Sequence, residues 1–209
     1  MRVVAALIAP VAALLFVLGS DVAVLLFGYG AATVDQASVM GDIVRVFMLG
    51  LLPFTLFYVL LRGFYSLEDT RTPFFITVAF SAVMLLLVVW FFSVFTNLGV
   101  SSAGGPQVAA IAFGYVLAYW FGFVLIWVWL ARKLGGVQSR RTVWVLVRLI
   151  LASVLTVIAL TFLRGVLIAV TPLASLPAQL NALVLIIVLG GVGVVSFYLL
   201  ALLMRVQEI

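Results

Sequence analysis

Residues 73–96 read PFFITVAFSAVMLLLVVWFFSVFT and contain no Lys, Arg, Asp or Glu. A helix needs about twenty mostly apolar residues to cross the hydrocarbon core of a bilayer, so this stretch predicts a membrane-spanning helix. Five other stretches meet the same criterion, and the full set is 3–27, 43–63, 73–96, 106–130, 143–170 and 179–204. These runs are too long for the ten-residue alternating strands of a membrane β-barrel. The sequence therefore predicts an all-α, polytopic membrane protein with six transmembrane helices.

The composition of the whole chain agrees with this prediction. Of its 209 residues, 67% are hydrophobic and only 8% are charged, whereas soluble domains are about half apolar and a quarter charged. The chain has no His and no Cys, which removes thiolate chemistry and the usual zinc ligands. We therefore expect no metal, no cofactor, no catalytic residue and no enzyme activity. Nucleic acid is not an expected partner, because the basic residues lie in short loops between apolar runs.

The Lys and Arg residues gather on one side of the predicted spans. They are Arg2, Arg62, Arg71, Arg132, Lys133, Arg140, Arg141 and Arg205. The loops on the other side, at about 28–42, 97–105 and 171–178, contain no Lys or Arg. Cytoplasmic loops of membrane proteins carry an excess of Lys and Arg, so this asymmetry predicts that both termini lie in the cytoplasm.

A few charged residues lie inside the predicted spans, where each costs about 2.5–3.5 kcal/mol near the helix centre. We interpret Arg148 and Arg164, near the ends of the fifth span, as side chains that snorkel to the interface. Arg45 has two possible partners, Asp42 three residues earlier and Asp21 at a similar depth on the first span. The three residues form either a structural ion pair or part of a polar cavity. On the second interpretation, Arg45, Asp42 and Asp21 are candidate substrate-binding residues.

The fourth span combines a row of small residues with a row of aromatic ones. Ala110, Gly114, Ala118 and Gly122 recur every four residues, a spacing that favours close helix packing. The neighbouring row is Tyr115, Tyr119, Phe123 and Trp127. We expect a helix–helix seam flanked by lipid-facing aromatic side chains, and the alternative is an aromatic wall that lines a cavity.

The most specific stretch is the charged connection Arg62-Gly63-Phe64-Tyr65-Ser66-Leu67-Glu68-Asp69-Thr70-Arg71-Thr72-Pro73. It reads as a helix end, a charge-paired turn and a new helix, with Thr72 as N-cap and Pro73 at the first helical position. Asp69 is expected to accept from free backbone N–H groups or to pair with Arg62 or Arg71. A turn of this kind can hold two helices as one rigid unit.

This stretch resembles the signature R-x-F-Y-A-x-x-D-T-R-T-P of the MurJ/MviN flippases, which belong to the MOP superfamily and move lipid II, the lipid-linked peptidoglycan precursor. The matching residues are Arg62, Phe64, Tyr65, Asp69, Thr70, Arg71, Thr72 and Pro73. Two weaker similarities lie upstream, at Pro10 with the segment 25–30 and at 45–53. The resemblance covers about residues 8–75 by motif and the rest by hydropathy.

The resemblance implies that the six spans correspond to helices nine to fourteen of a fourteen-helix transporter. Residues 1–132 would then be four helices of the second lobe, and 133–209 the final helix pair, which in the family forms a groove for the polyprenyl tail. Lipid II, membrane lipids and the helices that precede these six in the family are the implied partners. The implied location is the bacterial inner membrane. We expect a fragment, a split gene or a truncated gene that does not flip lipid II alone, because alternating access rocks one half against another.

Two alternatives remain at this point. The chain could be part of another MOP-type exporter of lipid-linked oligosaccharides or drugs, or a membrane scaffold subunit that transports nothing. Some family members bind sodium through Asn and Asp on the helix that matches 73–96. Because 73–96 has no Asn, Asp or Glu, we expect no sodium site there.

Overall fold

The computed structural model describes residues 1–29, 33–97, 105–134, 139–170 and 177–203. The described residues form six helices: α1 (Arg2–Phe27), α2 (Val34–Tyr65), α3 (Arg71–Asn97), α4 (Gly105–Lys133), α5 (Ser139–Val170) and α6 (Ala178–Leu203). All six are long and apolar enough to cross a membrane. The six predicted spans and the all-α class are confirmed. Of the predicted basic belt, Arg205 and the side chains of Arg140 and Arg141 lie outside the described residues.

The second helix begins earlier than the hydropathy indicated. The hydroxyl of Thr33 accepts from the backbone N–H of Gln36 at 3.2 Å, and the Gln36 side chain accepts from the backbone N–H of Thr33 at 3.1 Å. This reciprocal capping box satisfies two backbone donors and starts α2 at Val34. Asp42 therefore lies within a helix and not in the predicted loop at 28–42.

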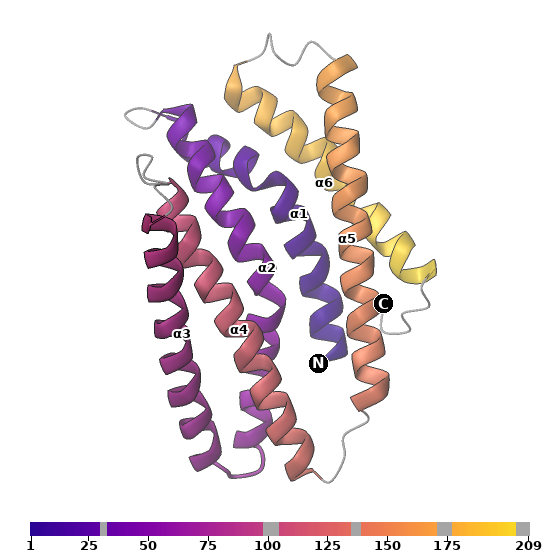
Figure 1. The fold of residues 1–209 in the computed structure, drawn as a ribbon. Coiled ribbons are helices and arrows are strands. Elements are labelled where there is room, and N and C mark those ends of the chain that lie inside the picture. Colours follow the sequence, from indigo (N-terminus) through magenta and orange to yellow (C-terminus); the bar gives the residue numbers. More distant parts are fainter. Residues whose placement is uncertain (30–32, 98–104, 135–138, 171–176, 204–209) are drawn as a thin grey trace.

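The helices pack in two sets around a central pair. The pair α1 and α2 is in extensive contact, with α4 packed against α2 and α3 against α4 on one side. On the other side, α5 and α6 both pack against α1 (Figure 1). The main core lies between α1, α2, α4 and α5, where Phe57, Phe64 and Ile126 are fully buried.

A proline within α2 creates one of the links between helices. Pro53 has no N–H, so the carbonyl of Leu49 lacks its ordinary helical donor. The indole Nε1 of Trp120, on α4, donates to this carbonyl at 3.3 Å. A backbone acceptor inside a membrane needs such a partner, so the proline and the tryptophan together join α2 to α4.

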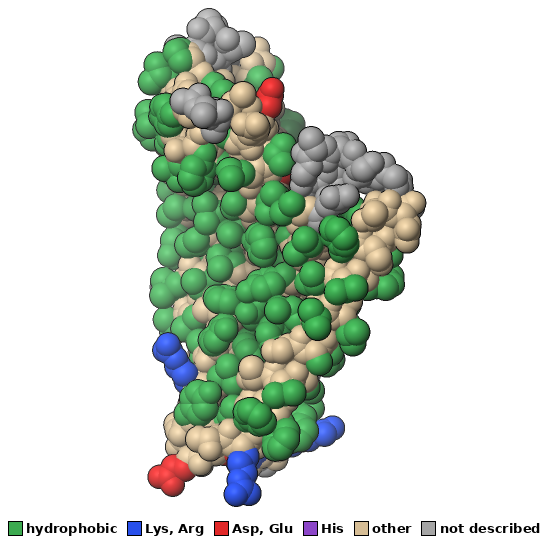
Figure 2. All heavy atoms as spheres, turned by 90° about the vertical axis from the view of Figure 1, so that its left-hand side faces the viewer, with side chains coloured by type: hydrophobic (Ala, Val, Ile, Leu, Met, Phe, Trp, Pro, Cys, Tyr) green, Lys and Arg blue, Asp and Glu red, His purple; other side chains and the backbone are tan. Residues whose placement is uncertain are grey.

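The outer surface is apolar, as expected for a lipid-facing protein. On α3 only Pro73, Ile76 and Phe80 are buried. Side chains more than 60% exposed on this helix include Phe74, Phe75, Leu85 and Leu86. Figure 2, which views the molecule from the α3 side, shows a largely hydrophobic surface with its visible basic side chains towards the lower end and acidic side chains near both ends. The chain is thus a multi-pass membrane protein with its charges near the ends of the bundle.

The small-residue seam on α4 is confirmed. A Cβ atom on Gly114 would lie 2.9 Å from the Cα of Val88, so α3 and α4 approach closely there. The prediction of lipid-facing aromatic side chains was wrong at Phe123, which is 9% exposed and lines an apolar hollow together with Trp127, as the alternative predicted. It was also wrong at Tyr119, which is 4% exposed. Its ring packs against Phe57 of α2 and Phe80 of α3 instead of facing lipid, because α4 is covered by helices on two sides.

Candidate functional site

Two ion pairs form a polar cluster near one end of the bundle, where α1, α2 and α5 meet. The buried carboxylate of Asp21, on α1, faces the guanidinium of Arg164 on α5. Arg164 Nη2 donates to Asp21 Oδ1 at 2.9 Å, and its Nη1 lies 2.9 Å from Oδ2. The interpretation of Arg164 as a snorkelling side chain was therefore wrong, because a buried partner on α1 is within reach.

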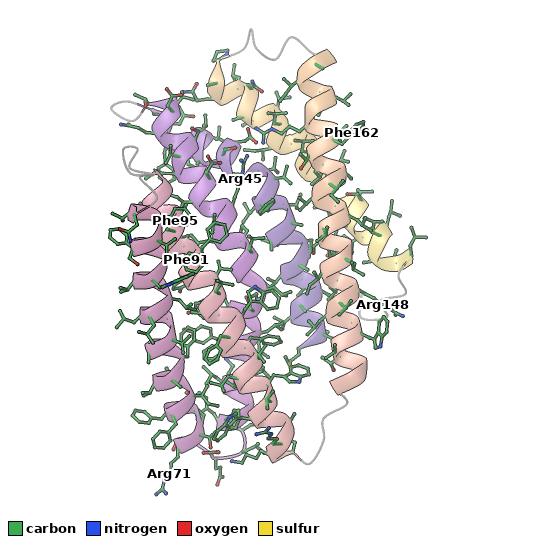
Figure 3. The ribbon with its side chains drawn as sticks, viewed as in Figure 1. Arg45, Arg71, Phe91, Phe95, Arg148 and Phe162 are labelled. Atoms are coloured by element: carbon green, nitrogen blue, oxygen red, sulfur yellow. The ribbon has the colours of Figure 1, made fainter. Side chains whose placement is uncertain are left out.

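Arg45 occupies the α2 side of the same cluster. Its Nη1 donates to Asp42 Oδ1 at 2.9 Å, as the spacing of three residues predicted. Its Nη2 donates to the hydroxyl of Ser20 at 2.7 Å. Arg45 does not pair with Asp21, but Arg45 and Arg164 both reach the backbone carbonyl of Val17, at 3.5 and 3.1 Å. The three candidate residues thus lie together, with Arg164 as a fourth member; Arg45 is the labelled residue of the cluster in Figure 3.

A contact between two glycines brings α1 and α2 close enough for this arrangement. A Cβ on Gly41 would lie only 2.2 Å from the Cα of Ser20 and 2.8 Å from the carbonyl oxygen of Gly19. The backbones therefore touch, and the hydroxyl of Ser20 comes within reach of Arg45. Sequence reasoning missed this crossing, because it placed Gly41 in the loop at 28–42 and not in the second helix, which begins at Val34.

An apolar groove runs between α4 and α5, with α1 and α2 as its floor. It consists of two adjoining hollows of about 220 and 270 Å³ that share Leu52, Trp120 and Ile150. Along α5 the lining extends from Val143 to Ile158, which is about 22 Å of helix. Its surface is almost entirely hydrocarbon, with Ser153 the only polar side chain apart from the indoles in the lining. A groove of this shape and chemistry can hold an extended hydrocarbon chain.

The charged turn between α2 and α3 lies at the other end of the bundle, where Figure 3 labels Arg71. Asp69 Oδ1 accepts from the backbone N–H of Thr72 at 3.0 Å, and Oδ2 accepts from Nζ of Lys133 at the end of α4. These hydrogen bonds, first of all that from Lys133, hold the pKa of Asp69 below its ordinary value. The expectation that Asp69 accepts from a free backbone N–H group is confirmed. The alternative partners, Arg62 and Arg71, were wrong, because the end of α4 lies beside the turn and supplies Lys133.

The start of α3 also differs from the prediction that Thr72 is the N-cap and Pro73 the first helical residue. The helix α3 begins at Arg71 and is capped by Asp69, so Thr72 and Pro73 lie within its first turn. The end of α2 is closed by Glu68 N–H to Tyr65 and Asp69 N–H to Phe64, at 3.1 and 3.2 Å. This pattern is a Schellman motif, and it places Glu68 in the left-handed region at φ 56°. One carboxylate thus caps α3 and anchors α4, so the turn joins three helices.

Comparison with known proteins assigns the chain to a family. Residues 1–189 match the family model described as "Lipid II flippase MurJ". The chain belongs to the lipid II flippase MurJ family. The resemblance seen in the charged turn is confirmed by this match, which extends well beyond the signature.

The similar proteins of the MurJ family are longer than this chain. A "Probable lipid II flippase MurJ" of Buchnera aphidicola subsp. Baizongia pistaciae is 28% identical over 160 residues, which cover 77% of this chain and 29% of that protein. A protein of the same description from Rhizobium tropici is 32% identical over 124 residues, which cover 59% of this chain and 21% of that protein. The chain thus spans less than a third of the length of these relatives.

A solved structure has the same fold. The structure titled "Lipid II flippase MurJ, inward closed conformation" matches with a TM-score of 0.66 over 96% of this chain and 37% of that chain, at 15% sequence identity. Family and fold agree, and they support a multi-pass protein of the bacterial inner membrane from a transporter family.

Proposed function

We propose that this chain forms part of a lipid II flippase and contributes to it the helices of one side of an alternating-access transporter. The family match over residues 1–189 carries this proposal. It favours lipid II over the other substrates of MOP-type exporters and over a scaffold role, since the matching relatives share one description. Because the chain spans less than a third of those relatives, we expect the other half of the transporter to come from helices beyond these six.

The test of this proposal is genetic. Cells depleted of their own lipid II flippase are supplied with residues 1–209 alone, or with these residues joined to the preceding eight helices of a MurJ relative. We expect growth only with the longer protein. Growth with residues 1–209 alone would contradict the expectation that transport needs helices beyond these six. Failure of both proteins to support growth, at normal protein abundance, would contradict the flippase assignment.

Within this function, we propose that the polyprenyl tail of lipid II lies in the groove between α4 and α5. The final helix pair, here within 133–209, supplies one wall of the groove through α5, and α1, α2 and α4 supply the rest. An apolar tail binds favourably in a preformed, hydrocarbon-lined groove, because no protein segment has to become ordered on binding.

The groove is tested by filling it. Ile150 lines both hollows, so Ile150→Trp narrows the slot at its centre. Ile187→Trp on α6 is the matched control, since that side chain is 65% exposed and lines neither hollow. With lipid II carrying a photoreactive tail, we expect crosslinking to α4 and α5 to fall in the first variant only. Equal crosslinking in both variants would place the tail elsewhere.

We further propose that the end with the charged turn faces the cytoplasm, as the distribution of Lys and Arg favours. The chain has no Cys, so single-cysteine variants report on topology without background. Val34 and Leu67 are both exposed and lie at the two ends of α2. An impermeant thiol reagent should label Val34→Cys in intact cells and Leu67→Cys only in opened cells, and the reverse pattern would invert the topology.

Arg45 is our candidate for a contact with the pyrophosphate of lipid II as it leaves on the outer side. Most of its donors are already engaged, so a phosphate could bind in bidentate fashion only by displacing Asp42. The Asp42 side chain is 63% exposed, which makes this exchange accessible. Arg45→Lys keeps the charge and loses the planar fork. We expect this variant to lose transport at normal abundance; unchanged transport would leave Arg45 with a structural role only.

A further inference from the structure

A further hollow, separate from the groove and of about 470 Å³, lies beside the charged turn at the end of the bundle opposite Arg45. It is lined by Phe64 from the end of α2, Thr72 from the start of α3, and Trp129, Arg132 and Lys133 from the end of α4. These side chains combine two cations, a hydroxyl and two aromatic rings. A larger share of its surface is polar than in the groove, although the greater part is still apolar.

The two cations of this hollow differ in their partners. Lys133 is bound to Asp69 and lies 5.9 Å from the centre of the Phe64 ring, so its charge is already compensated. Arg132 is exposed, and within the part of the chain that the structure describes it forms no hydrogen bond or ion pair. The hollow therefore presents a guanidinium whose planar set of donors matches phosphate oxygens.

The surroundings place the hollow at the level of lipid headgroups. Trp129 is 49% exposed, and Trp side chains favour the boundary between water and hydrocarbon. Phe74 and Phe75, in the first turn of α3, are 63% and 67% exposed. From this end, exposed apolar side chains of α3 and α4 continue along the bundle, and Figure 2 shows the hydrophobic surface on the α3 side. A ligand with its phosphate at Arg132 would therefore lay any attached acyl chains along this surface.

We propose that this hollow binds the phosphodiester headgroup of an anionic glycerophospholipid. Arg132 forms the fork to the phosphate oxygens, Lys133 lines the hollow while it stays paired with Asp69, and Trp129 covers the glycerol region. Basic pockets between helices at the membrane surface are suited to such headgroups. The apolar rim favours a membrane lipid over a soluble phosphate compound. The site is separate from the proposed lipid II groove, so its failure would leave the flippase assignment intact.

The experiment measures lipid binding to the purified protein in nanodiscs. Phosphatidylglycerol is titrated into phosphatidylcholine discs, and the retained lipid is counted by native mass spectrometry. We compare Arg132→Gln with Arg71→Gln, which makes the same charge change at the same end of the bundle. Arg71 does not line the hollow, and its side chain points out from the end of α3 (Figure 3).

We expect Arg132→Gln to weaken phosphatidylglycerol retention about fivefold, the effect of one juxtamembrane cation, and Arg71→Gln to change it little. Arg132→Lys should restore part of the binding. Equal effects of the two glutamine variants would reduce the site to a general attraction of basic residues for anionic membranes. Displacement of phosphatidylglycerol by millimolar inorganic phosphate would point to a soluble phosphate ligand. Either result would overturn the proposal.

Discussion

The contact between Gly41 and α1 allows a quantitative prediction for Gly41→Ala. The added Cβ would lie 2.2 Å from the Cα and 2.6 Å from the N of Ser20, whereas carbon atoms in contact lie about 3.5–4.0 Å apart. Both obstructing atoms belong to the backbone, so no side-chain rotation relieves the clash. The helices must separate by about 1 Å or more.

The free energy of unfolding should fall accordingly. Overpacking typically costs about 1–3 kcal/mol, and the separation also lengthens the 2.7 Å bond from Arg45 to Ser20. Replacing Gly by Ala within a helix raises the free energy of unfolding by about 1 kcal/mol, which offsets part of this cost. We expect a net loss of about 2 kcal/mol, with the larger cost coming from packing.

Gly191→Ala is the matched control, because a Cβ there has no atom within 4 Å. This variant keeps the gain in helix propensity without the clash, so it should equal or slightly exceed the parent chain in stability. Unfolding of the purified protein by increasing SDS in mixed micelles, followed by far-ultraviolet circular dichroism, gives both values. If Gly41→Ala is as stable as Gly191→Ala, the close approach of α1 and α2 at this point is wrong.

Three further predictions use the same unfolding assay. Asp69→Ala should destabilise the protein more than Glu68→Ala, because Asp69 alone caps α3 and binds Lys133; similar losses would refute this ranking. Glu68→Gly should stabilise by about 1 kcal/mol, since glycine adopts the left-handed conformation without strain, and a loss of stability would contradict it. The lowered pKa of Asp69 means that its contribution is present above its ordinary pKa of 3.8 and is lost as the pH falls below it; Asp69→Asn should remove this acid dependence, and an unchanged pH profile would refute the assignment.

The sequence was sufficient for every element of this fold that depends on hydrophobicity alone. The charge-free run 73–96 and its five counterparts predicted the helices, because an uninterrupted apolar segment of this length has few alternatives in a membrane. The family signature at Arg62–Pro73 also identified the family, later matched over residues 1–189. Local spacing predicted the pair of Asp42 with Arg45, since residues three apart in a helix are neighbours.

Partners that come from distant helices could not be predicted in this way. Asp21 pairs with Arg164 and Asp69 with Lys133, and each pair depends on which helices are adjacent and on their rotation. Hydropathy indicates the depth of a residue in the membrane. It indicates neither which helices are adjacent nor how each helix is rotated about its axis. The aromatic row on α4 was misjudged for the same reason, because its amphipathic pattern does not show that Phe57 and Phe80 cover Tyr119.

The polar links found in the described residues divide the helices into two groups. The helix α1 is joined to α5 at both ends, through Arg2 with Thr142 at 3.2 Å and through Asp21 with Arg164. It is also joined to α6, because Gln179 donates to the carbonyl of Gly28 at 2.7 Å.

The helix α4 is joined to α2 through Trp120 and to the α2–α3 turn through Lys133. The boundary between the two groups runs along the apolar groove, whose floor is formed by α1 and α2. Outside the groove lining, these two helices also cross at Gly19 and Gly41, where Arg45 supplies the polar link. Apolar surfaces can slide past one another at little cost, whereas buried ion pairs resist separation. Because α5 is joined to α1 and α4 to α2, we expect a change in the width of the groove to involve movement between α1 and α2. A substitution at the glycine contact, which lies outside the groove lining, is then expected to alter how a lipid tail is held.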